Sequence, residues 1–125
     1  MLKKGLLAIT IIYSVALAIV CLINIRQLPE VEVSNIDKIF HFITYFLLMC
    51  LWYFSLTYAL KFIQKKGLWY AFLIAFIFGI VIEVLQGTVT KTRALDVFDI
   101  IANTLGALLA TLVLSIYTKL QVKNK

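Results

Sequence analysis

The chain has 125 residues, of which 63% are hydrophobic and 14% are charged, and its mean hydropathy is +1.02. Soluble domains contain about 45–50% apolar residues, so this chain has too few polar side chains to cover a small soluble domain. The excess of apolar over charged residues excludes an intrinsically disordered protein, and two cysteines are too few for a disulfide-stapled secreted module. The composition therefore predicts a small multi-pass membrane protein.

Four continuous apolar stretches are long enough to cross a bilayer, which requires about 20 mostly apolar residues. The stretches cover about residues 5–23, 39–60, 68–86 and 97–117. Because they do not alternate between polar and apolar positions, they indicate helices and argue against a β-barrel. No linker, repeat or low-complexity segment divides the sequence. We therefore predict a single all-α domain over residues 1–125, a polytopic membrane protein built as a four-transmembrane-helix bundle.

Lysines gather on one side of this expected bundle. They lie before the first stretch, between the second and third stretches, and after the fourth: Lys3, Lys4, Lys61, Lys65, Lys66, Lys119, Lys123 and Lys125. Basic residues near span ends are retained on the cytoplasmic side, so both termini are predicted to be cytoplasmic. The net charge of +6 is then explained by topology and by contact with anionic lipid, and no nucleic-acid partner is predicted.

The apolar stretches themselves carry few residues that indicate chemistry. Cys21 and Cys50 lie at different depths and are expected to be packing residues. The many Phe, Trp and Tyr residues of the second stretch are expected to face lipid. The first stretch resembles a signal peptide in its basic start, but its apolar run is long for a signal core, so a retained span is favoured.

All six acidic residues lie at or near the end of the bundle opposite the lysines: Glu30, Glu32, Asp37, Glu83, Asp96 and Asp99. Residues three or four apart share one face of a helix. This spacing gives three polar stripes, namely Asp37, His41 and Tyr45; Glu83 and Gln86; and Asp96, Asp99 and Asn103. Three helices are therefore expected to bring polar faces to one depth near the outer side of the membrane.

Small residues indicate the direction of these faces. Ala71, Ala75 and Gly79 precede Glu83 at intervals of four, and a second set lies near the Asp99 stripe: Gly106, Ala107 and Ala110. Small residues mark surfaces where membrane helices approach closely, so Glu83 and Asp99 are predicted to face the bundle interior. A carboxylate placed in the membrane costs about 2.5–3.5 kcal/mol on insertion scales, and such residues are candidates for function.

Together these motifs resemble the polar signature of the VanZ-like family. In chain order they are Asp37-Lys38-x-x-His41, Glu83-x-x-Gln86 and Arg93-x-x-Asp96-x-x-Asp99-x-x-x-Asn103-x-x-Gly106. The resemblance covers about residues 37–110, and Ala110 stands where the family often has glycine. It implies a bacterial cytoplasmic-membrane protein of the kind linked to resistance to teicoplanin-type glycopeptides. It implies no particular molecular activity.

The candidate catalytic residues are His41, Glu83 and Asp37, because a carboxylate beside an imidazole can orient it for acid–base chemistry. Asp37 fits a capping box with Ser34 at the start of the second helix equally well. Arg93 is expected to pair with the nearby carboxylates, and contact with a phosphate or carboxylate of a ligand is the alternative. The predicted binding residues all lie at the polar end: Lys38, His41, Tyr45, Gln86, Arg93, Asp96, Asp99 and Asn103.

The acids and the single histidine supply enough oxygen and nitrogen atoms for a divalent ion. The chain has no H-E-x-x-H motif and no cysteine cluster, so neither a metal nor another cofactor is predicted. The first functional hypothesis is an outward-facing polar pocket that recognises an anionic lipid-linked envelope intermediate, a cell-wall precursor or a glycopeptide antibiotic.

The alternative hypothesis is an intramembrane hydrolase or transferase that acts on lipid-linked headgroups with His41 and Glu83. A proton- or ion-coupled transporter is disfavoured because the inner half of every predicted span lacks ionisable residues. A purely structural role and self-association stay open.

Overall fold

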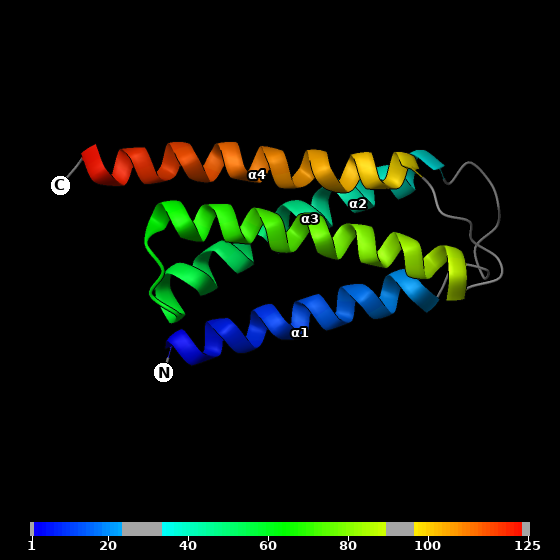
Figure 1. The fold of residues 1–125 in the computed structure, drawn as a ribbon, viewed down its shortest axis with the longest axis horizontal. Coiled ribbons are helices and arrows are strands. Elements are labelled where there is room, and N and C mark those ends of the chain that lie inside the picture. Colours follow the sequence, from blue (N-terminus) through cyan, green and yellow to red (C-terminus); the bar gives the residue numbers. More distant parts are fainter. Residues whose placement is uncertain (1, 24–33, 90–96, 124–125) are drawn as a thin grey trace.

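The computed structural model describes residues 2–23, 34–89 and 97–123. This part of the chain forms four long helices: α1 (Leu2–Ile23), α2 (Ser34–Phe54), α3 (Gln64–Val89) and α4 (Val97–Lys123). The helices run along a common long axis (Figure 1). Each contains an apolar segment long enough to cross a membrane, over Lys3–Leu22, Lys38–Ala59, Gln64–Leu85 and Val97–Leu120. The prediction of an all-α bundle of four membrane-spanning helices is confirmed.

All four helices extend beyond the apolar stretches that predicted them. α1 begins at Leu2, α2 begins at Ser34, α3 ends at Val89 and α4 ends at Lys123. Hydropathy marks only the part of a helix that fits the hydrocarbon layer, whereas the backbone keeps its hydrogen bonds by continuing the helix through the polar ends. As a result, Lys38 belongs to α2 and not to a loop, and it shares a helix with His41.

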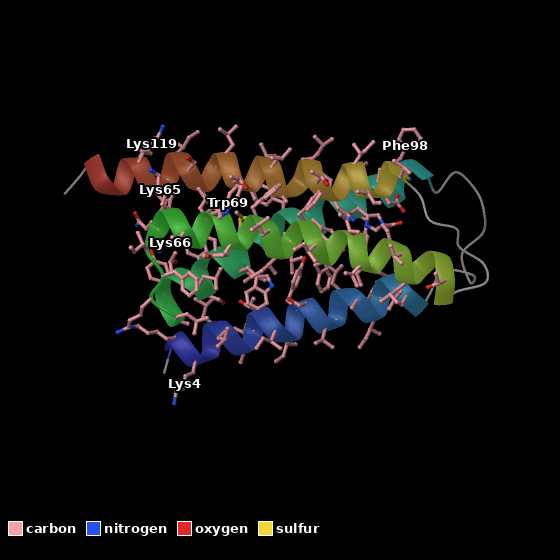
Figure 2. All side chains as sticks on the ribbon, in the orientation of Figure 1. Lys4, Lys65, Lys66, Trp69, Phe98 and Lys119 are labelled. Carbon is pink, nitrogen blue, oxygen red and sulfur yellow. The ribbon has the colours of Figure 1, made fainter. Side chains whose placement is uncertain are left out.

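The end of α2 sets the direction of the chain toward α3. A short π-helical segment, Ser55–Ala59, follows α2, and the Leu60 N–H donates to the Ser55 carbonyl oxygen at 3.0 Å. Lys61 has a φ of 62°, the left-handed conformation that commonly ends helices. The following turn places Lys65 and Lys66 at the same end of the bundle as Lys4 and Lys119 (Figure 2).

The outside of the bundle is covered by large apolar side chains on all four helices. Ile12 of α1 is 66% exposed and Phe98 of α4 is 68% exposed. Trp69, at the lysine end of α3, is also exposed (Figure 2). A soluble monomer rarely exposes so much contiguous apolar surface, whereas lipid tails solvate it well.

The aromatic residues of α2 are distributed differently from the expectation that they face lipid. Tyr45 and Tyr53 are fully buried, and Trp52 is half-buried and donates its indole N–H to the Ser14 Oγ at 3.1 Å. The expectation is therefore wrong for Tyr53 and Trp52, whereas Tyr45 belongs to the polar stripe predicted to face inward. The physical reason is complementary packing, since the large rings share one core with small residues of α3 and α4: Ala71, Ala75, Ala107 and Ala110.

Further hydrogen bonds join α1 to the second helix and its π-helical end. The Thr10 and Ser55 hydroxyls lie 2.7 Å apart, and the Tyr13 hydroxyl donates to the Thr44 carbonyl oxygen at 2.7 Å. Interhelical hydrogen bonds of this kind contribute about 0.6 kcal/mol each in membrane proteins. α1 thus packs against the rest of the bundle through α2 and α3.

The closest helix pair is α2 with α4, and a glycine makes that contact possible. A Cβ atom added to Gly106 of α4 would collide with the Phe42 carbonyl oxygen of α2. Gly106 is buried, as are Ala107 and Ala110. The predicted stripe of small residues is therefore the surface on which α4 meets the bundle, and it fixes the distance between the polar ends of α2 and α4.

Candidate functional site

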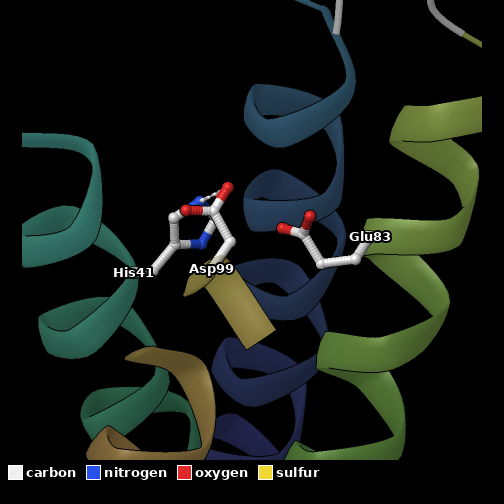
Figure 3. A group of neighbouring side chains, drawn as sticks. All are labelled: His41, Glu83 and Asp99. Carbon is white, nitrogen blue, oxygen red and sulfur yellow. Dashed lines mark ion pairs between the residues drawn. The ribbon is translucent and has the colours of Figure 1, made fainter. Parts of the chain in front are cut away.

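Three titratable side chains from three helices meet near the end of the bundle opposite the lysines. His41 comes from α2, Glu83 from α3 and Asp99 from α4 (Figure 3). Their exposed fractions are 1%, 0% and 0%, and one potential ligand atom from each lies within 4.8 Å of the other two. The prediction that Glu83 and Asp99 face the interior is confirmed. We refer to His41, Glu83 and Asp99 as the charged layer.

Asp99 is the centre of the contacts in this layer. Its Oδ1 lies 2.7 Å from the Lys38 Nζ, and its Oδ2 lies 3.5 Å from the His41 Nε2. The Lys38 side chain is 29% exposed, whereas that of Asp99 is fully buried. One carboxylate therefore links a partly exposed ammonium to a buried imidazole, and it ties α4 to α2 at the polar end of the bundle.

A second layer lies one helical turn deeper, where each helix contributes a residue four positions from the charged layer: Tyr45, Gly79 and Asn103. A Cβ placed on Gly79 would lie 3.0 Å from the Asn103 Nδ2 and 3.3 Å from the Tyr45 Cε2. The missing side chain of Gly79 thus provides the space that the Asn103 amide and the Tyr45 ring occupy. Tyr45 is 0% exposed and Asn103 is 3% exposed, so both polar groups lie inside the protein.

Lys38 brings one positive charge to this cluster, and Glu83 and Asp99 bring two carboxylates. Charges in a low-dielectric interior are costly unless they are paired. The 2.7 Å contact between Asp99 and Lys38 is one such pairing. Chemically, the cluster can exchange protons, ligate a cation or present Lys38 to an anion.

Six of the predicted site residues are brought together by the described helices: Lys38, His41, Tyr45, Glu83, Asp99 and Asn103. Asp37 and Gln86 lie in α2 and α3, but their side chains fall outside what the structure describes. Arg93 and Asp96 lie outside the described residues. The predicted pairing of Asp37 with His41 and of Arg93 with the carboxylates therefore stays a prediction.

The sequence did not predict the ion pair between Lys38 and Asp99, because Lys38 was expected to contact a ligand. The i, i+3 spacing of Lys38 and His41 could have indicated that both face the same neighbours, because it places them on one face of a helix that begins before Lys38. The role of Gly79 was also missed. The sequence indicated only that Gly79 allows close packing of helices, whereas in the structure Gly79 makes room for the side chains of Tyr45 and Asn103.

Comparison with known families gives one result for the chain. The family model VanZ/LLP1 matches residues 6–118. Searches of the curated proteins and of the solved structures returned no match. The matched region includes all of α2 and α3 and most of α1 and α4, so it contains every described residue of the charged layer and of the deeper layer. The chain therefore belongs to the VanZ/LLP1 family, as a multi-pass membrane protein with four membrane-spanning helices.

Proposed function

We propose that the protein binds the anionic headgroup of a lipid-linked envelope intermediate at the polar end of the bundle. The observation that carries this proposal is the Lys38–Asp99 pair, in which the lysine is 29% exposed and the carboxylate is buried. The buried carboxylate holds the ammonium at the membrane end of α2, in a position that a headgroup can reach. Lysine is a common ligand for phosphate, and its charge attracts carboxylates as well.

The three residues of the charged layer, His41, Glu83 and Asp99, influence how strongly the headgroup binds. His41 lies next to the Lys38–Asp99 pair, and Glu83 and Asp99 place two carboxylates beside the lysine. An anion that enters the site must compete with Asp99 for Lys38. This competition disfavours small anions that are well solvated in water. The distribution of lysines supports an outward-facing pocket in a bacterial cytoplasmic membrane, because the polar end lies opposite Lys4, Lys65, Lys66 and Lys119 (Figure 2).

Replacing Lys38 with glutamine is expected to weaken headgroup binding at least about tenfold, since a hydrogen bond to a charged group contributes about 1.5–3 kcal/mol. The probe is a long-chain polyprenyl phosphate, titrated into protein in phosphatidylcholine nanodiscs and followed by native mass spectrometry. Lys119→Gln is the matched control because Lys119 is an exposed lysine at the opposite end. Equal affinity of the two variants would overturn the proposal.

A second arm of the same test separates lipid-linked intermediates from glycopeptides. Teicoplanin replaces the polyprenyl phosphate as the probe, and growth in its presence is compared for cells that express wild-type protein or the His41→Ala and Glu83→Gln variants. We expect both variants to lose the protective effect of the wild type. Growth identical to wild type in both variants would contradict a contribution of this site to resistance or envelope homeostasis.

A hydrolase or transferase acting on lipid-linked headgroups is the second candidate function. It is favoured by the 3.5 Å contact between the His41 Nε2 and the Asp99 Oδ2, with the Glu83 carboxylate beside them. This arrangement pairs an imidazole with two carboxylates, as acid–base catalysis requires. Purified protein should then release phosphate from lipid phosphates or pyrophosphates, and His41→Ala should abolish the release. A wild-type rate equal to that of protein-free nanodiscs would exclude this candidate.

A further inference from the structure

We infer that the charged layer is a binding site for a divalent transition-metal ion of the Zn²⁺ or Mn²⁺ type. His41, Glu83 and Asp99 each direct one potential ligand atom to a common point, within 4.8 Å of one another. In a tetrahedral zinc site with bonds of about 2.0–2.1 Å, two ligand atoms lie about 3.3–3.4 Å apart. Side-chain rotations that bring the ligand atoms closer by up to about 1.4 Å close the three residues around an ion.

The kinds of ligand atom at the site indicate which metal ions it binds. One imidazole nitrogen and two carboxylate oxygens suit zinc and manganese, whereas calcium and magnesium favour sites made of oxygen atoms alone. Three protein ligands also leave a coordination position open. The ion lies beside the two fully buried carboxylates of Glu83 and Asp99. Lys38 contacts the Asp99 Oδ1, while the Oδ2 lies toward His41.

A second and independent observation comes from the deeper layer. Within the described part of the chain, the Tyr45 hydroxyl and both polar atoms of the Asn103 amide are buried without a hydrogen-bond partner. The Tyr45 ring lies 6.2 Å from the His41 ring, measured between centroids, and Asn103 follows Asp99 by one turn on α4. Buried polar groups almost always have a partner. Ligands or water around an ion one turn above would give these two groups partners.

This proposal does not depend on the proposed function, because the probe is the metal ion alone. Protein is stripped with chelator, exchanged into phosphatidylcholine nanodiscs, titrated with Zn²⁺ or Mn²⁺ by calorimetry, and assayed for bound metal by mass spectrometry. We expect about one ion per chain, in line with three converging ligands. Titration with Co²⁺ provides a second readout, since its visible absorption reports the coordination geometry.

The variants Glu83→Gln, Asp99→Asn and His41→Gln keep side-chain size and hydrogen bonding, and each is expected to lower affinity at least about 100-fold. Ser55→Ala is the matched control because it removes a buried hydroxyl at the other end of α2. Thermal unfolding and elution as a single species show that each variant is folded.

Two results would overturn the assignment. One is a wild-type protein that binds less than a tenth of an ion per chain in the presence of micromolar Zn²⁺ and Mn²⁺. The other is binding that is equal in the wild type and in folded Glu83→Gln and Asp99→Asn variants.

Discussion

Substituting alanine for Gly106 is expected to destabilise the protein by at least about 2 kcal/mol, near the upper part of the range for overpacked cores. The added methyl group would overlap the Phe42 carbonyl oxygen, which belongs to a helix backbone and cannot rotate away as a side chain can. α2 and α4 would have to separate, and that movement would carry Asp99 away from Lys38 and His41. The free energy of unfolding in bicelles, measured by steric trapping, gives the size of the effect.

The same substitution at Gly5 is the matched control. A Cβ at Gly5 of α1 meets nothing within 4 Å, and alanine is favoured over glycine within a helix by about 0.5–1 kcal/mol. Gly5→Ala should therefore leave stability unchanged or raise it slightly. If Gly106→Ala proved as stable as Gly5→Ala, the close contact between α2 and α4 would not exist in the membrane.

The second large effect is an asymmetry between the two partners of the Lys38–Asp99 pair. Removing one partner of a buried ion pair costs about 3–5 kcal/mol, and the partial exposure of Lys38 lowers this to about 2–3 kcal/mol for Lys38→Met. That variant leaves a carboxylate in a fully buried position. Asp99→Asn should cost only about 1 kcal/mol, because the remaining ammonium can extend toward the headgroups.

A double-mutant cycle measures this asymmetry directly. The Lys38→Met and Asp99→Asn double variant should lose less stability than the two single variants combined, by at least about 1 kcal/mol, because the residues are in contact. The cycle is run by steric trapping in chelator-treated bicelles, so that no metal ion compensates the carboxylates. Additive losses, or a larger loss for Asp99→Asn than for Lys38→Met, would show that the 2.7 Å contact does not govern stability.

The site was only partly predictable from the sequence because helical spacing fixes neighbours within one helix but not between helices. The i, i+4 spacing placed His41 above Tyr45 and Asp99 above Asn103, and the small residues before Glu83 predicted that it faces inward. Which carboxylate meets the histidine depends on the rotation and depth of separate helices. Spacing could place Asp37 on the face of His41, but it could not show that Asp99 of the fourth helix also reaches His41.

The aromatic residues of α2 give a second example of this limit. Hydropathy treats the rings of Tyr53 and Trp52 as compatible with either lipid or core, so composition alone could not place them. Their positions follow from the volume left free beside the alanines of α3 and α4 and from the Ser14 hydroxyl on α1. Both are properties of neighbouring helices, and they exist only once the bundle has formed.

The sequence by itself determined that the helices are surrounded by lipid, how many helices span the membrane, and at which end of the bundle the polar residues lie. These properties follow from the length of apolar runs and from the sign of the charges between them, both of which are local. Tertiary structure alone decided that Lys38 contacts Asp99, that Gly79 leaves space for Tyr45 and Asn103, and that His41, Glu83 and Asp99 converge. Each of these depends on close contact between helices that are far apart in the chain, and Gly106 sets that approach for α2 and α4.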